Sequence, residues 1–138
     1  MFLLDTNAIS EPKRARPDAA LVDWLSNQLF SDLYLSVITV GELRRGIVRL
    51  EPSRRRDDLD FWLADLILRY DQRILPVDLD VTERWASLAE AQRAAGRASD
   101  MTDELIAATA HVHGLTVVTR NVGHFEHSGC RVLSPWSE

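Results

Sequence analysis

The chain has 138 residues, of which 46% are hydrophobic, and its net charge is −5. This length predicts one domain over residues 1–138 with enough apolar side chains to bury a core. The single cysteine, Cys130, rules out an internal disulfide and fits a reducing cytoplasm. The apolar stretch after Met1 stops at Asp5, which argues against a secretory signal, and no apolar run approaches the roughly 18 residues of a membrane span. We therefore expect a soluble cytoplasmic protein that does not contact a membrane.

Short apolar segments alternate with helical patterns along the chain. Strands are expected at Phe2–Leu4, Leu33–Val37, Ile74–Val77, Thr116–Thr119 and Arg131–Leu133. Helices are expected over residues 19–29, 40–50, 53–67, 81–95 and 102–113. This alternation predicts an α/β fold with βαβ units, a mainly parallel sheet and helices on both faces. Pro76 lacks an amide hydrogen, so the third strand is expected to lie at an edge or to end there, and Trp136 is expected to pack back onto the body.

The basic residues are clustered although the overall charge is negative. All but one of the 16 are arginine, and six of these lie between residues 44 and 56. The negative balance argues against a nonspecific nucleic-acid coat, which is usually strongly basic. The arginine cluster fits either bidentate phosphate contacts or a solvated helix face.

Three acidic residues lie where strands end or helices begin. Asp5 follows the first expected strand, Glu42 follows the second by a few residues, and Asp103 opens the helix that leads into the fourth. Because parallel strands end at a common edge of the sheet, these side chains and Asn121, after the fourth strand, are expected to converge.

Each of the three acids also has a structural explanation. Asp5 is of a type that often caps a helix, Glu42 stands at the capping-box spacing from Thr39, and Asp103 lies in a first turn that favours negative charge. Clustered carboxylates repel one another, however, and their unpaired burial is costly, so such a group normally holds a cation. Oxygen ligands alone select Mg²⁺, with Mn²⁺ as the alternative, and favour phosphodiester hydrolysis.

Four motifs lie in register along the chain, namely LLDTN at the start, GEL after the second strand, DELIAATA before the fourth strand and TRNVGHF after it. Together they resemble the motifs of the PIN domain, in particular the VapC-like toxin ribonucleases. The resemblance covers essentially the whole chain and implies a three-layer α/β/α sandwich with a five-stranded, mainly parallel sheet. It also implies a divalent-metal-dependent RNA endonuclease, the toxin of a type II toxin–antitoxin pair. A VapB-type antitoxin would hold it inactive, in a homodimer or a toxin–antitoxin hetero-oligomer.

Carried over residue by residue, the resemblance implies that Asp5, Glu42 and Asp103 bind the metal and carry the catalysis. Thr6 and Asn7 match the polar residues that support the first aspartate. Many members place an aspartate in the last motif, where this chain has Asn121 and His124. Because of this departure, the number of bound metal ions, one or two, stays open.

The chemistry that follows is hydrolysis by a metal-activated water, which predicts 5′-phosphate and 3′-hydroxyl ends. Glu42, with its longer side chain, is expected to orient or deprotonate that water. Three arginines are candidates for phosphate contact, namely Arg44, Arg45 and Arg120. General acid–base catalysis by His124 is the metal-independent alternative.

An antitoxin segment is expected to lie across the helices between Val40 and Ile67. Two other classes of protein remain as alternatives to the toxin nuclease. The first is a catalytically inactive PIN-like module that binds nucleic acid or protein. The second is another α/β protein, such as a phosphatase or a receiver domain. Asn7 stands where a haloacid-dehalogenase-type phosphatase needs an aspartate, and the acidic pair of a receiver is absent after the first strand.

Overall fold

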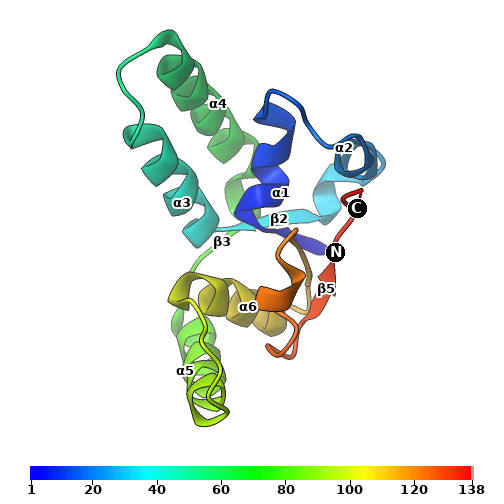
Figure 1. The fold of residues 1–138 in the computed structure, drawn as a ribbon, viewed down its shortest axis with the longest axis vertical. Helices are drawn as coiled ribbons and strands as arrows, with labels where there is room; N and C mark the ends of the chain where they lie inside the picture. Colours follow the sequence, from blue (N-terminus) through cyan, green and yellow to red (C-terminus); the bar gives the residue numbers. More distant parts are fainter. Residues whose placement is uncertain (138) are drawn as a thin grey trace.

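A parallel five-stranded sheet organises residues 1–137, the part of the chain that the computed structural model describes (Figure 1). Its strands are short: β1 (Phe2–Leu4), β2 (Leu33–Ser36), β3 (Ile74–Leu75), β4 (Thr116–Val118) and β5 (Arg131–Leu133). The α-helices of this part are α1 (Thr6–Ser10), α2 (Ala19–Ser26), α3 (Val37–Val48), α4 (Arg54–Tyr70), α5 (Leu79–Ala94) and α6 (Met101–His113). Short 3₁₀ turns are η1 (Glu11–Lys13), η2 (Phe30–Asp32), η3 (Asp71–Arg73) and η4 (Val122–His124).

The strand order is β3-β2-β1-β4-β5, and every neighbouring pair is parallel. The α/β class, the five strands and the edge position of β3 expected from the sequence are confirmed. The order reverses at β1, because β2 and β3 lie on one side of it and β4 and β5 on the other. In open α/β sheets such a reversal leaves a crevice at the carboxyl ends of the two strands that flank it. Here those strands are β1 and β4.

Three of the expected strands end earlier than predicted, β4 by one residue at Val118. β3 stops at Leu75, because Pro76 has no amide hydrogen to continue the ladder. β2 stops at Ser36, whose hydroxyl accepts the backbone amide of Ile38 at 3.0 Å and caps α3. Helix α3 therefore begins at Val37, before the start that the apolar spacing indicated.

Successive residues of the central strand serve the two faces of the sheet. Leu4 packs into a cluster with residues of α1, α2, α3 and α4, whereas Leu3 packs with residues of α5, α6 and β4. Figure 1 shows the α3–α4 hairpin at one end of the molecule and the α5–α6 pair at the other. Trp136 joins the first cluster at 8% exposure, which confirms that the last residues before position 138 pack onto the body. No helix in the described range is long and apolar enough to cross a membrane.

Candidate functional site

Asp5 lies at the carboxyl end of the central strand, where β1 turns into α1. Its backbone amide still donates to Val118 of β4 at 2.9 Å, so its position is fixed by the sheet. One carboxylate oxygen accepts the amide of Thr6 at 2.8 Å and caps α1. The other accepts the hydroxyl of Thr119 at 2.8 Å, and the residue is only 5% exposed. Asp5 is thus both a helix cap and a buried carboxylate at the sheet reversal.

Thr119 connects the segments that follow the two flanking strands. Its hydroxyl donates to Asp5 and accepts the side-chain amide of Asn7 at 3.4 Å and the backbone amide of Asn121 at 3.1 Å. The carbonyl oxygen of the Asn7 side chain accepts the backbone amide of Arg120 at 3.2 Å. Asn7 therefore links α1 to the segment after β4, and its role in supporting the site stays a prediction. Thr119 was missed, because a threonine ending an apolar strand looks like an ordinary strand residue.

Glu42 is brought to the same edge by α3. Its Oε1 accepts the hydroxyl of Thr6 at 2.6 Å, so the residue after Asp5 also holds the second acid. The capping box considered for Thr39 and Glu42 is wrong, because Ser36 caps this helix and Thr39 lies inside it, fully buried. The carboxylate of Glu42 is therefore not needed to complete the start of α3.

Asp103 reaches the edge from the first turn of α6, where Asp100 is the N-cap. Its Oδ2 lies 3.0 Å from Nδ1 of His124, a residue of η4. The side chain of Asp103 is 22% exposed, whereas that of His124 is 59% exposed. His124 thus orients an acid, and the Asp100 carboxylate adds a charge that sequence analysis did not single out.

The three acids influence one another electrostatically. Burial is the largest cause that raises the pKa of Asp5, and a smaller opposing effect is the hydrogen bond from Thr119. Burial also raises the pKa of Glu42 and of Asp103, and the negative charge of Asp5 raises both further. The charge of Asp100 adds to the rise in both pKa values. The site therefore concentrates negative charge that its surroundings do not fully compensate.

The donor chemistry of this group fits a hard divalent cation. Asp5, Glu42 and Asp103 offer carboxylate oxygens, the ligands that Mg²⁺ and Mn²⁺ prefer. Across residues 1–137, no three acidic, histidine or cysteine side chains are gathered closely enough to hold an ion by themselves. Mg²⁺ typically takes one or two carboxylates and completes its shell with waters and substrate phosphates. The arrangement therefore fits an ion whose shell the substrate completes.

The three arginines considered for phosphate contact are not gathered at the acids. Arg44 pairs with Asp60 of α4 at 2.5 Å, on the hairpin side of α3. Arg45 is exposed in the last turn of that helix. Arg120 is exposed and follows Thr119, so of the three it lies nearest in the chain to the sheet reversal. Phosphate contact by these residues stays a prediction.

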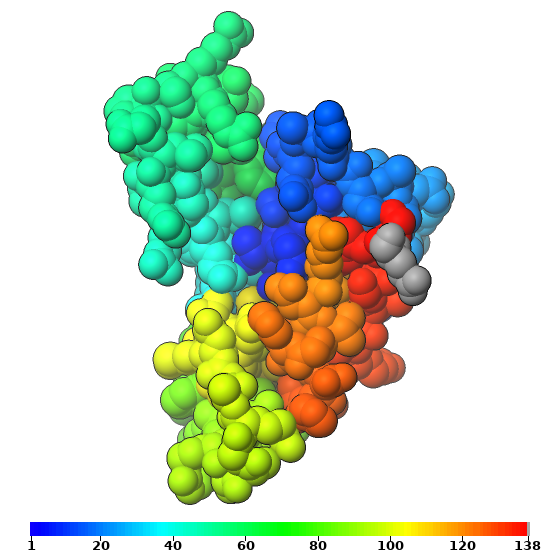
Figure 2. Space-filling model, viewed as in Figure 1, coloured from blue at the N-terminus to red at the C-terminus, as the bar shows by residue number. Residues whose placement is uncertain are grey.

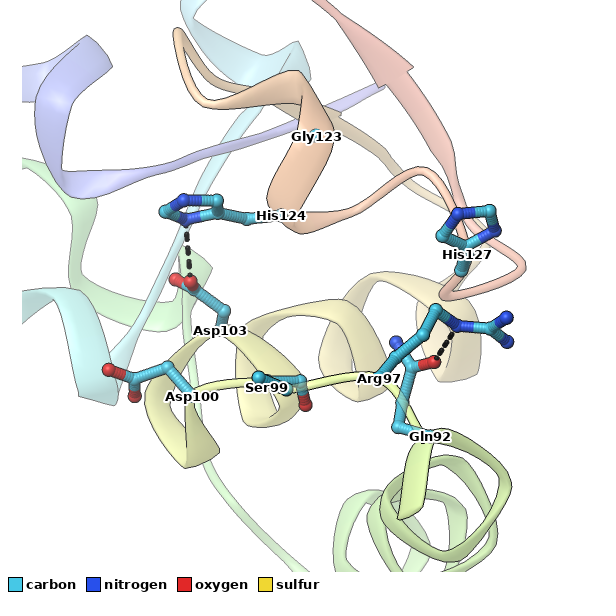
Figure 3. Close-up of a pocket in the computed structure, with 9 residues that line it drawn as sticks. Gln92, Arg97, Ser99, Asp100, Asp103, Gly123, His124 and His127 are labelled. Atoms are coloured by element: carbon cyan, nitrogen blue, oxygen red, sulfur yellow. Dashed lines mark hydrogen bonds and ion pairs between the residues drawn. The ribbon is translucent and has the colours of Figure 1, made fainter. Parts of the chain in front are cut away.

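Two clefts flank the acids. One, of about 430 Å³, extends from Asp103 and His124 along the loop between α5 and α6 (Figure 3). The other, of about 280 Å³, runs between α1 and the α3–α4 hairpin and is lined by Thr6 of α1 and Glu42 of α3, among others. In Figure 2 this second cleft lies between the blue N-terminal segment and the teal and green hairpin. A long ligand could therefore approach the acids from either side.

Comparisons with known proteins agree with this architecture. The family model described as "PIN domain" matches residues 2–128. The chain is 44% identical over 137 residues to the plasmid stability protein StbB of Pseudomonas syringae pv. tomato, covering 99% of both. It is 39% identical over 137 residues to the VapC ribonuclease Y4jK of Sinorhizobium fredii, covering 99% of this chain and 98% of that one. It is also 40% identical over 139 residues to the toxin FitB of Neisseria gonorrhoeae, covering all of both.

The fold agrees with a solved structure as well. The crystal structure of FitAcB from Neisseria gonorrhoeae matches with a TM-score of 0.94 and 39% sequence identity, covering 100% of both chains. The match therefore includes the sheet, both helical layers and the segments that carry the acids.

Proposed function

Because the chain belongs to the PIN domain family, we propose that it is the toxin of a type II toxin–antitoxin pair and that it hydrolyses RNA with the help of Mg²⁺. Relatives of nearly full length support the proposal, since one is named a VapC ribonuclease and another a toxin. Mn²⁺ is the alternative ion, because it accepts the same oxygen ligands.

The observation that carries this proposal is the convergence of Asp5, Glu42 and Asp103 on the sheet reversal. Each has a raised pKa; the charges of Asp5 and Asp103 contribute to the rise for Glu42, and the charge of Asp5 contributes to the rise for Asp103. In the described part of the chain, none of the three forms an ion pair with lysine or arginine. Holding uncompensated carboxylates together costs stability, and a bound cation removes that cost.

In this mechanism Asp5 and Asp103 would hold the ion directly, and Glu42 would bind it directly or through a water; neighbouring hydroxyls keep two of the three acids in place. Thr119 fixes Asp5, and Thr6 fixes Glu42. When bound, Mg²⁺ lowers the pKa of a water and polarises the scissile phosphate. Glu42, with its longer side chain, would orient the attacking water and accept its proton. The products carry 5′-phosphate and 3′-hydroxyl ends.

The test is cleavage of end-labelled RNAs by the protein freed of any antitoxin. We expect cutting in Mg²⁺, none in EDTA, and a loss on the order of 100-fold or more in Asp5→Asn, which keeps the cap of α1 but removes the charge. Asp65→Asn is the matched control, because Asp65 is an exposed acid of α4 paired with Arg69 at 3.1 Å.

Cleavage that persists in EDTA, or ends carrying a 2′,3′-cyclic phosphate, would contradict the mechanism and favour acid–base catalysis by His124. A protein that cuts no RNA and whose stability does not respond to Mg²⁺ would instead be the catalytically inactive PIN-like binding module.

The cleft beside α1 is the surface we assign to the antitoxin. Its walls include apolar side chains of α3 and α4, and its rim carries Lys13, Arg14 and Arg55. An amphipathic antitoxin segment with acidic residues complements such a surface, and an arginine at its end would reach Glu42. This position lies within the helices between Val40 and Ile67 that the sequence indicated.

Leu59 lines this cleft, so a carboxylate there would remove an apolar contact and repel the acidic residues of the antitoxin segment. Leu59→Glu should still cut RNA but resist inhibition by the antitoxin encoded beside the toxin, as measured by titrating antitoxin into the cleavage assay. The exposed Phe61→Glu on the same helix is the control.

The homodimer or hetero-oligomer expected from the sequence stays a prediction, and light scattering with and without antitoxin measures it.

A further inference from the structure

The cleft beside α6 has acidic residues at one end and basic residues at the other. Asp100, Asp103 and His124 form one end, nearest the sheet reversal. Arg97 and His127 lie at the other end, as Figure 3 shows. Its volume of about 430 Å³ is within the usual range for pockets that take small molecules. The cleft thus joins a site for a cation to a basic end.

The loop that forms one wall is held in place by side chains of the two flanking helices. The guanidinium Nε of Arg97 donates to Oε1 of Gln92 at 2.8 Å, and the backbone amide of Arg97 donates to the Gln92 carbonyl at 3.0 Å. The hydroxyl of Ser99 donates to Glu104, whose other oxygen accepts the indole of Trp85 at 3.2 Å. The basic end is therefore positioned before any ligand arrives.

Arg97 is the group in this wall best suited to hold an anion. Gln92, only 7% exposed, orients the guanidinium through Nε and leaves its terminal nitrogens free of that bond. Within residues 1–137, Arg97 forms no ion pair with a carboxylate, unlike Arg93 on the neighbouring turn, which pairs with Glu90 at 2.5 Å. A planar guanidinium with free donors matches a phosphate in shape and charge.

On the premise of the proposed function, we propose that this cleft binds the nucleotide next to the scissile phosphate. The scissile phosphate lies at the acidic end, the ribose and base occupy the cleft, and Arg97 holds a phosphate further along the strand. A strand with splayed-out bases fits this cleft, whereas a continuous duplex does not.

The experiment compares wild type with Arg97→Gln, using Arg93→Gln as the matched control. Binding of a fluorescent single-stranded RNA is measured by anisotropy in EDTA, where cleavage is absent, over a series of salt concentrations. We expect Arg97→Gln to weaken binding on the order of tenfold, the equivalent of one charge-assisted hydrogen bond. The slope of log K against log salt should fall by about 0.7, as for one lost phosphate contact on a single strand.

A second variant tests the cleft without changing charge. Ala98 lines the cleft beside Arg97, so Ala98→Trp fills it. It should raise KM for RNA in Mg²⁺ and change the preferred cleavage sequence, while the salt slope stays that of wild type. Circular dichroism and thermal melts of all variants establish that they are folded.

The outcomes separate this inference from the function on which it rests. If wild type cuts RNA in Mg²⁺ but Arg97→Gln and Ala98→Trp behave like Arg93→Gln, the cleft does not bind the nucleotide and only this inference fails. If the variants keep RNA binding but lose antitoxin binding, the cleft takes a protein segment instead. If wild type neither binds nor cuts RNA, the proposed function fails, and the inference fails with it.

Discussion

The geometry of Asp5 depends on one hydroxyl that comes from the far end of the chain. Thr119 is fully buried and satisfies Asp5, Asn7 and the backbone of Asn121 with a single oxygen. Its hydrogen bond is also the largest effect that lowers the pKa of Asp5 against the rise caused by burial. Thr119 therefore holds a buried carboxylate in place and favours its ionised form.

Thr119→Val retains the shape of the side chain but removes this hydroxyl. We expect a loss of about 1.5–3 kcal/mol in the free energy of unfolding, because a buried charged group loses its donor. RNA cleavage should fall by at least about tenfold, since support of a ligand is worth 10–100-fold. Urea unfolding and initial cleavage rates measure the two effects. Thr119→Ser, which keeps the hydroxyl, should stay near wild type, and equal losses in both variants would contradict the role assigned here.

Much of the site was predictable at this scale, and the reason is topological. Asp5, Glu42 and Asp103 could be expected to converge, because parallel strands end on one edge and the helix before β4 starts there. The contribution of Thr119 could not be predicted, since it depends on which two strands flank the reversal of the strand order. The charge of Asp100 was also missed, because a helix-capping aspartate gives no signal of a nearby acid.

At the scale of elements, polar caps decide where the helices begin. Ser36, Ser53, Asp78 and Asp100 each accept a backbone amide at the start of a helix. The apolar spacing used for prediction records which helix face is buried, so it located the helices but placed several of their starts too late. The start of α3 matters most, because it sets the position of Glu42.

Ser36→Ala should therefore affect activity as well as stability. Losing an N-cap costs about 1 kcal/mol, and here fraying of the first turn of α3 also frees Glu42 to shift away from Thr6. Ser53→Ala removes the equivalent cap of α4 at the tip of the hairpin. We expect similar losses of stability in thermal melts, but a fall in RNA cleavage only for Ser36→Ala. Equal cleavage by the two variants would show that the start of α3 does not position Glu42.

At the scale of the whole molecule, the last described residues are fastened to the first helical layer. Trp136 packs into the core cluster of α1–α4, and both the amide and the hydroxyl of Ser137 donate to Asp18, the N-cap of α2, at 3.2 and 2.5 Å. The hydroxyl of Ser137, followed by the amide of Leu21, holds the pKa of Asp18 below its ordinary value. These contacts join the last described residues to the start of α2, on the face of the sheet that α1–α4 cover.

Asp18→Asn should lower the melting temperature in a manner that depends on pH. A carboxyl whose pKa is depressed on folding stabilises the protein above its ordinary value of about 3.9, and this contribution disappears as the pH falls through the lower folded value. The melting difference between wild type and variant should therefore be largest near neutrality and shrink below about pH 4. Asp23→Asn, an exposed acid on the same helix, is the control. A difference that is the same at every pH would show that the charge of Asp18 does not contribute.

The position of β1 at the centre of the sheet has a consequence for synthesis of the protein on the ribosome. Its partner β4 and the Thr119 hydroxyl are made late, because Asp5 and Thr119 are separated by 114 positions. Until they emerge, the nascent chain carries a central strand with one open edge and an aspartate that lacks the hydrogen bond from Thr119. Contacts between residues this distant in sequence form slowly, after the local contacts. Most of the chain must therefore leave the ribosome before Asp5, Glu42 and Asp103 can form one site.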